Sequence, residues 1–173
     1  MPEQPRTRDC VVLVKGDTLP VVVGETLALT GWKGGQGVSW ENSTKDEFRI
    51  APTDGNPCGF MIWGSDETSD QFTAQTRSQP YYRFATLCFG GWQLSTTTYE
   101  RHTYASRVGG GPLVPLTYNP SDRLYFSLRG YWTKEDEWTL SSDPRAPNPW
   151  VIGYVSQIPS SLTGYYLGVQ VAI

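Results

Sequence analysis

Residues 166–173 read Tyr166-Leu-Gly-Val-Gln-Val-Ala-Ile173, with a branched aliphatic side chain at every second position. Alternate side chains of an extended strand share one face, whereas the side chains of a helix repeat every 3.6 residues. The spacing therefore predicts a strand with a buried aliphatic face at the end of the chain. The same alternation over 124–129 and 26–30 predicts two further, half-buried strands.

Short apolar runs separated by turn-forming residues are spread along the rest of the chain. They lie at 10–14, 19–23, 60–63, 81–89, 92–99 and 150–155. The 173 residues include 18 glycines and 13 prolines, and only 18% are charged, which is atypical of coiled coils and long solvated helices. We therefore expect an all-β, single-domain, antiparallel β-sandwich or barrel of jelly-roll-like type. Helix is expected at most over Ser43–Phe48.

The first nine residues differ from the rest because they contain no apolar side chain after Met1. This composition predicts an extended N-terminal arm over 1–9, outside a single β-rich domain over 10–173. Lys15-Gly-Asp-Thr18 predicts a tight turn between the first two strands, with Gly16 free to take a positive φ. The prolines within 141–149 predict an exposed, extended loop.

Charge and hydropathy exclude several classes of partner. The chain has 14 Lys and Arg against 17 Asp and Glu, and its basic residues are scattered, so we expect no nucleic acid as main partner. No stretch approaches the roughly 18 consecutive apolar residues that a membrane span requires, and the first residues lack the apolar centre of a signal peptide. We therefore expect a soluble protein that has neither a membrane partner nor a secretion address.

The residues that usually carry chemistry are sparse, so we expect no catalytic residue, no cofactor and no metal site. His102 is the only histidine, which leaves multi-histidine metal sites and Ser-His-Asp arrangements incomplete, and we interpret it as an exposed strand residue. Cys10, Cys58 and Cys88 are odd in number and widely spaced. This pattern favours reduced, buried thiols over a disulfide framework or a zinc site.

Two polar stretches invite other interpretations. The glycine-rich stretch 31–37 matches no phosphate-binding spacing, and we interpret it as a mobile loop that exposes Trp32. The acidic residues of Glu135-Asp-Glu137, like those at 46–47 and 66–70, lie among polar neighbours and are expected to be solvated surface charges. Because paired carboxylates can act on a glycosidic bond, Glu135, Asp136 and Glu137 leave an enzyme acting on cell-wall or capsule sugar as a third possibility.

The seven tryptophans and ten tyrosines are the most informative excess. Trp and Tyr are enriched at interface hot spots, and exposed aromatic faces also stack on sugar rings. We expect about half of these side chains in the core and the remainder on a contact surface. The residues expected to bind a partner are Pro2, Pro5, Arg6 and Arg8 of the arm, together with Trp32, Trp132, Trp138 and Trp150.

From residue 118 onward, short strand motifs follow one another in a recognisable order. The chain reads Asn119-Pro-Ser-Asp-Arg-Leu-Tyr-Phe-Ser-Leu-Arg-Gly130, then Trp150-Val-Ile-Gly-Tyr-Val155, Ile158-Pro159 and Tyr165-Tyr-Leu-Gly-Val-Gln-Val171. This order resembles the small bacteriophage capsid decoration, or cement, proteins, in which D-x-L-Y, I-G-x-V and L-G-V-x-V strands recur. The matching residues are Asp122, Leu124, Tyr125, Gly130, Ile152, Gly153, Val155, Pro159, Leu167, Gly168, Val169 and Val171.

The resemblance implies a non-enzymatic protein that binds the major capsid protein on the outside of an assembled phage head and stabilises it. It further implies a homotrimer, located on the virion exterior and, during assembly, in the host cytoplasm. The arm and exposed aromatic residues would make the contacts. A glycan-binding module, or the receptor-binding tip of a phage or bacterial surface protein, is the alternative, with Trp32, Trp63 or Trp132 as its stacking platform.

Overall fold

The computed structural model describes residues 9–23, 32–40, 47–50, 57–62, 84–141 and 151–173. Three predicted segments lie wholly or largely outside these residues: the arm expected over 1–9, except for Asp9, the strand expected over 26–30, and the loop expected over 141–149, except for Ser141. In the part of the chain that is described, no helix is long and apolar enough to cross a bilayer.

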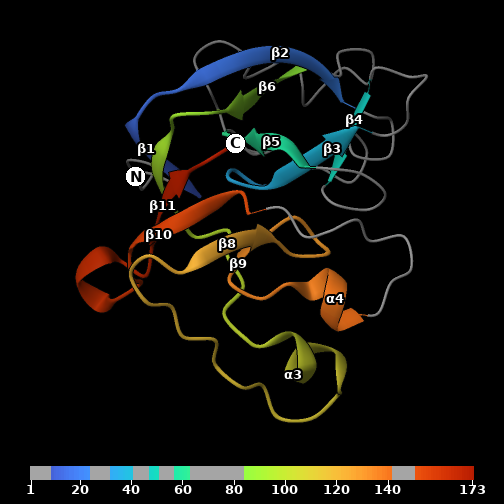
Figure 1. Cartoon of the computed structure of the whole chain (residues 1–173), viewed down its shortest axis with the longest axis vertical. Helices are drawn as coiled ribbons and strands as arrows, with labels where there is room; N and C mark the ends of the chain where they lie inside the picture. Colours follow the sequence, from blue (N-terminus) through green and yellow to red (C-terminus); the bar gives the residue numbers. More distant parts are fainter. Residues whose placement is uncertain (1–8, 24–31, 41–46, 51–56, 63–83, 142–150) are drawn as a thin grey trace, which may run out of the picture.

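Strands make up most of the regular secondary structure in the described part of the chain (Figure 1). In chain order the strands are β1 (Cys10–Val14), β2 (Asp17–Val23), β3 (Gly37–Trp40), β4 (Glu47–Ile50), β5 (Pro57–Met61), β6 (Phe84–Phe89), β7 (Gln93–Thr96), β8 (Arg123–Phe126), β9 (Trp132–Thr133), β10 (Gly153–Gln157) and β11 (Leu167–Val171). The helical segments are α3 (Tyr104–Val108), α4 (Glu137–Ser141) and the 3-10 turn η1 (Ser161–Thr163). The all-β prediction is confirmed.

The C-terminal strand lies inside an antiparallel six-stranded sheet with the order β1-β7-β11-β10-β8-β9. β11 pairs with β7 on one side, where Leu167 lies opposite Thr96, and with β10 on the other, where Val171 lies opposite Gly153. Leu167, Val169 and Val171 are all buried. The buried aliphatic face that the alternation predicts is therefore confirmed.

The other five strands form a smaller sheet in the order β2-β4-β3-β5-β6, which closes because β6 pairs back with β2. Its pairings are antiparallel except for a short parallel contact of β2 with β4, from Val22 to Val23. In Figure 1 this sheet lies above the six-stranded sheet. The helix predicted over Ser43–Phe48 is wrong at Glu47 and Phe48, which belong to β4. Pairing of β4 with β3 outweighs the weak local preference of these residues for helix.

A two-stranded ribbon runs through both sheets. β1 pairs with β7 in the six-stranded sheet, and their continuations β2 and β6 pair in the five-stranded sheet, starting with Asp17 opposite Phe89. The tight turn expected over Lys15–Thr18 is therefore wrong, since the chain bends there and continues into the second sheet. Gly16 is required by a close approach and not by a positive φ, because a Cβ on it would lie 1.8 Å from the Gly90 carbonyl oxygen.

Aromatic side chains fill the space between the two sheets. Phe60 of β5 meets Trp92 and Trp132 edge-on, with ring centroids 5.8 and 5.9 Å apart. Phe126 of β8 lies 4.7 Å from the Trp132 ring. Edge-to-face contacts at such distances add to the stabilisation from buried area. The core therefore joins residues from both sheets.

The short helices α3 and α4 were not predicted, because a five-residue helix shows no helical periodicity in the sequence. Thr103 caps the start of α3 with its side chain, and Asp136 accepts a hydrogen bond from the Thr139 N–H at the start of α4. The two helices bring Arg107 of α3 to Glu137 of α4.

Candidate functional site

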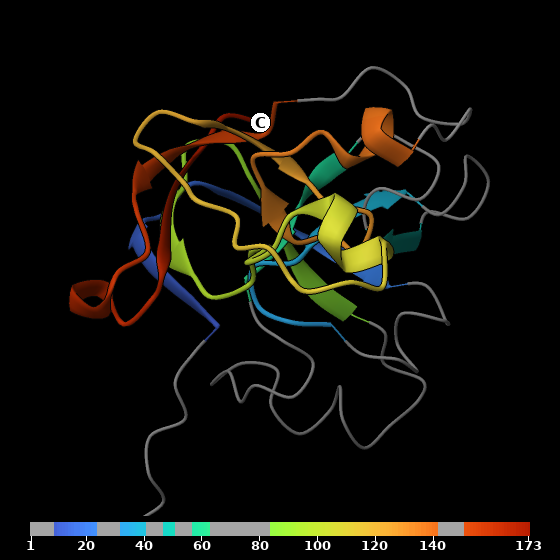
Figure 2. The same ribbon diagram turned by 90° about the horizontal axis from the view of Figure 1, so that it is seen from below.

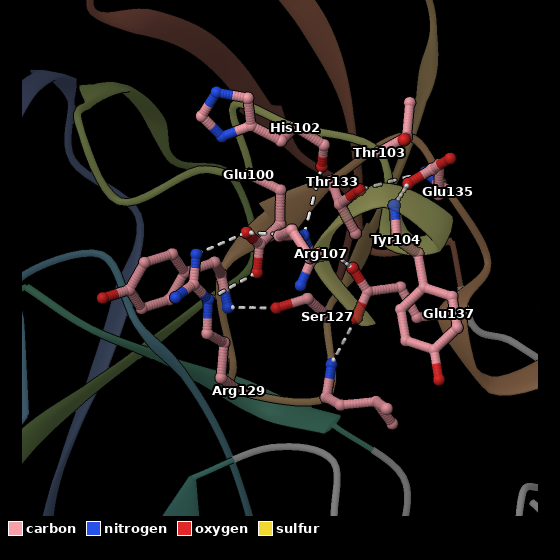
Figure 3. Close-up of polar contacts among 12 residues, drawn as sticks. Glu100, His102, Thr103, Tyr104, Arg107, Ser127, Arg129, Thr133, Glu135 and Glu137 are labelled. Atoms are coloured by element: carbon pink, nitrogen blue, oxygen red, sulfur yellow. Dashed lines mark hydrogen bonds and ion pairs between the residues drawn. The ribbon is translucent and has the colours of Figure 1, made fainter. Parts of the chain in front are cut away.

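Two fully buried carboxylates, Glu100 and Glu137, stand out among the described residues (Figure 3). Arg129 donates from Nε and Nη2 to the two oxygens of Glu100, over 2.8 and 2.6 Å. These hydrogen bonds to Glu100 are the main reason that the pKa of Arg129 is raised. A buried carboxylate is tolerated only when partners of this kind replace its water.

Arg107 links the two carboxylates. Its Nη2 donates to Oε1 of Glu137, and its Nε lies 3.5 Å from Oε2 of Glu100. The same Nε donates to the His102 carbonyl, and the Leu128 N–H donates to Oε2 of Glu137 over 3.0 Å. All four carboxylate oxygens therefore have a donor or an ion-pair partner. The network ties α3 to α4 and to the turn after β8 (Figure 3).

The three consecutive acidic residues from Glu135 to Glu137 each have a structural partner. Oε2 of Glu135 accepts from the Tyr104 N–H over 2.7 Å, and Asp136 holds the start of α4. The expectation of a solvated surface charge is wrong for Glu137, because α4 turns this side chain inward to Arg107. That partner is 30 residues away in the sequence, so local spacing does not reveal it.

The described cysteines are buried and His102 is half-buried. Cys10 and Cys88 are buried, as predicted, whereas the side chain of Cys58 lies outside the described residues. Burial raises the pKa of the Cys88 thiol to about 12, which keeps it protonated and a poor nucleophile at neutral pH. His102 is half-buried and forms a β-bridge with Pro115, so the prediction of an exposed strand residue is wrong. Within the described ranges, no group of three or more His, Cys, Asp and Glu residues could hold a metal ion.

The glycine-rich stretch belongs to the core. Residues 34–37 are buried, and the Gly35 and Gly37 N–H groups donate to carbonyls of β5 and of the β8–β9 turn, over 2.6 and 2.8 Å. Amides engaged in this way are not available to cradle a phosphate. The prediction of a mobile loop is therefore wrong for residues 34–37. Trp32, which was expected to be exposed, is half-buried.

Trp132, expected on a contact surface, is completely buried in β9. Its Nε1–H donates to the Gly35 carbonyl over 2.7 Å, and its ring packs against Phe60 and Phe126. A partner-binding or glycan-stacking role for Trp132 is wrong, because the indole fills the core between the sheets. The remaining contact residues stay predictions, since the description covers neither the Trp138 side chain nor Trp63, Trp150, Pro2, Pro5, Arg6 and Arg8.

The turn between β10 and β11 carries an exposed apolar surface that the sequence analysis missed. We call residues 158–166 the β10–β11 tip; its exposed apolar side chains are Ile158, Leu162 and Tyr165. Leu162 is 97% exposed, and in both ribbon views the tip projects from the body (Figures 1 and 2). The Ser160 N–H donates to Oγ1 of Thr163 over 2.9 Å, and the Tyr99 hydroxyl donates to the Tyr165 carbonyl, also over 2.9 Å. One hydrogen bond therefore lies within the tip, and the other fastens it to Tyr99.

Strand β1 carries another exposed apolar surface. Val11–Val14 are between 38% and 60% exposed, although an uninterrupted apolar run is typical of a buried strand. The strand lies at one end of the six-stranded order. Its exposure follows from that position, which the run of aliphatic residues does not indicate.

No family model, no curated protein and no solved structure matches this chain. The resemblance of the C-terminal third therefore stays a prediction that its short strand motifs carry. The exposed apolar side chains of the β10–β11 tip and of β1 remain as a guide to function.

Proposed function

We propose that the protein is a non-enzymatic structural protein of a phage virion, which binds the outer surface of the assembled capsid and stabilises it as a homo-oligomer. The resemblance implies three copies. The observation that carries the proposal is the β10–β11 tip, where an apolar side chain as exposed as Leu162 lies on a hydrogen-bonded turn. Burial of an exposed apolar side chain by a partner is favourable. A few side chains of this kind contribute most of the free energy of binding at an interface.

The strands that resemble decoration proteins are neighbours in space. β11, β10 and β8 are consecutive in the six-stranded sheet. Residues of the three motifs share one buried cluster, among them Leu124, Ile152, Val155, Leu167 and Val169. The β10–β11 tip connects two of these strands, so the resemblance and the exposed apolar surface coincide in one part of the chain.

The strand register supports a joint role of the arm and the tip. Cys10 lies opposite Thr96 of β7, and Thr96 lies opposite Leu167, the residue that follows the tip. Asp9 is fastened at the same level, because its carbonyl accepts from the Thr97 N–H over 2.9 Å. Asp9, the first described residue, therefore lies at the end of the six-stranded sheet that carries the tip. The proposal is that the arm before Asp9 and the tip bind the same surface.

The buried carboxylates support a non-enzymatic role. A glycosidase needs two carboxyl groups on either side of the bond that it cleaves, and a general acid or base needs an oxygen within reach of the proton. In Glu100 and Glu137 each oxygen already has a donor or an ion-pair partner within the fold. Their arrangement is that of a structural ion-pair network.

Cosedimentation with capsids of the phage that encodes the chain tests the proposal. The variant Leu162→Ser should weaken capsid binding by roughly thirtyfold, since a hot-spot anchor contributes about 2 kcal/mol. The matched control is Leu140→Ser on α4, where the leucine is 55% exposed, and it should bind like the wild type.

Two results count against the proposal, and they do so at different levels. Equal capsid binding by the Leu162→Ser and Leu140→Ser variants would remove the tip from the contact. Wild-type protein that stays in the supernatant at every capsid concentration would discard capsid binding itself.

A further inference from the structure

Tyr165, in the β10–β11 tip, has a backbone conformation that a tyrosine rarely adopts. Among the described residues other than glycine, positive φ angles occur at Ser121 (69°) and Tyr165 (62°). In this left-handed region the Cβ of an L-residue crowds its own backbone, and a bulky residue is an outlier there. Glycine or asparagine adopts such a φ with less strain. The backbone at position 165 therefore favours a residue other than tyrosine.

The fold gains little from the Tyr165 side chain. The Tyr165 N–H donates to the Ser160 carbonyl over 2.8 Å, and the Tyr165 carbonyl accepts from the Tyr99 hydroxyl over 2.9 Å, but other residue types could form these backbone bonds as well. The side chain is 57% exposed and has no hydrogen bond or ring contact within the described part of the chain. Strained backbone of this kind is found preferentially at ligand-binding and other functional sites.

The tip also lacks charge. From Ala146 to Ile173 the sequence contains no Asp, Glu, Lys, Arg or His. The exposed side chains of Ile158, Leu162 and Tyr165 therefore lie among uncharged residues of the tip. Burial of apolar side chains is favourable, whereas burial of a charge without a partner is not. The surface that best complements the tip is therefore apolar and uncharged.

We propose that the tip binds an apolar, uncharged pocket of the capsid protein, and that Tyr165 is an anchor there together with Leu162. The inference rests on the capsid binding proposed above. It adds the chemistry of the pocket and a second residue that fills it.

Two other occupants fit the tip less well. Apolar segments that bind membranes commonly carry Lys or Arg, which attract anionic lipids, and the tip has neither. Two copies joined tip to tip would bury little surface, because a stable pair of proteins buries about 800 Å² on each partner. A segment that projects from the body, as the tip does in Figures 1 and 2, instead suits a concave pocket that surrounds it.

Substitutions at position 165 separate binding from folding. Tyr165→Asn should weaken cosedimentation with capsids by about tenfold, the loss expected when a binding anchor is removed. The melting temperature should be unchanged or higher, because asparagine tolerates the left-handed φ. Tyr165→Phe should bind like the wild type, since it keeps the aromatic ring. Wild-type capsid binding by the Tyr165→Asn variant, or a clear fall in its melting temperature, overturns the role of Tyr165 as an anchor.

Ser121→Asn is the matched control for the backbone, since Ser121 also has a positive φ and lies outside the tip. This variant should keep or raise the melting temperature, and it should bind capsids like the wild type. An equal loss of capsid binding in Ser121→Asn and Tyr165→Asn would mean that the loss does not come from the tyrosine side chain, which overturns the assignment.

Charges of both signs test the pocket. Leu162→Lys and Leu162→Glu should each bind capsids more weakly than Leu162→Ser, because an apolar pocket offers no partner to either charge. If one of the charged variants binds more tightly than Leu162→Ser, the pocket carries the opposite charge and the proposal is wrong.

Two measurements without capsids test the other occupants. Wild-type protein should not cosediment with vesicles of phosphatidylcholine and phosphatidylserine, and light scattering should give Leu162→Ser the same native mass as the wild type. Vesicle binding that Leu162→Ser abolishes would assign the tip to a lipid surface, and a smaller mass of this variant would assign it to a contact between copies. Either result overturns the pocket.

The outcomes for this inference and for the proposed function can be told apart. Wild-type protein that does not bind capsids removes the proposed function and the pocket with it. Wild-type protein that binds capsids, together with a Tyr165→Asn variant that binds equally well, removes the role of Tyr165 and leaves the proposed function in place.

Discussion

Among the described residues, Arg107 joins two buried carboxylates that lie far apart in the sequence. It contacts Glu100 and Glu137, which come from different parts of the chain. Arg129, in contrast, is mainly solvent-exposed and forms its ion pair with Glu100. Removing one partner of a buried ion pair leaves the other charge without compensation. The cost therefore exceeds that of breaking a pair of solvated charges.

Replacement of this arginine should destabilise the fold strongly. Arg107→Met is expected to lower the free energy of unfolding by about 3 kcal/mol, because Glu137 stays buried but loses its cation. Lys134→Met is the control, since Lys134 pairs with Asp122 over 3.7 Å and both side chains are partly solvated; its cost should be about 0.5 kcal/mol. Urea unfolding followed by tryptophan fluorescence measures both values, and equal losses would contradict the structural role of the network.

At the scale of elements, the bend of the two-stranded ribbon is where the two sheets meet. Gly16 approaches the Gly90 carbonyl so closely that any side chain must displace backbone, and Cδ1 of Trp92 lies 2.5 Å from the position of a Cβ. The chain can therefore pass from one sheet to the other at this point only because residue 16 is a glycine, which has no side chain.

Gly16→Ala tests this dependence. We expect a loss of about 3 kcal/mol in the free energy of unfolding, the upper range for overpacking, because a backbone carbonyl cannot move away as a flexible side chain can. Gly111→Ala is the matched control, with no atom within 4 Å of its Cβ, and should be neutral or stabilising by about 0.5 kcal/mol. Thermal unfolding of both variants decides, and similar melting temperatures would disprove the close-approach argument.

The sequence predicts elements whose signal is local. β8 and β11 fall on segments with period two, and β1, β2, β6, β7 and β10 fall within or beside short apolar runs, whereas β3 and β9 are too short to show a period. Gly16 was misjudged because glycine marks both turns and close approaches, and only the strand order separates the two. Trp132 and Glu137 were misjudged for a related reason: polar neighbours in the sequence do not reveal which side chains the fold turns inward.

For the whole molecule, the end at which the arm leaves the six-stranded sheet also carries the β10–β11 tip. Two segments on one rigid body that reach the same surface bind it together more tightly than either does alone, because the second contact forms at a high effective concentration. The proposed capsid contact would therefore use the arm and the tip together, although they are separated by almost the whole length of the chain.

Deletion of residues 1–8 tests the joint attachment. The deletion should weaken capsid cosedimentation and leave the melting temperature unchanged, because Asp9 and its bond to the Thr97 N–H remain. Combined with Leu162→Ser, it should abolish binding, since neither segment is left to hold the other near the capsid. If the deletion leaves capsid binding unchanged both in the wild type and in the Leu162→Ser background, the arm is not part of the contact and the tip acts alone.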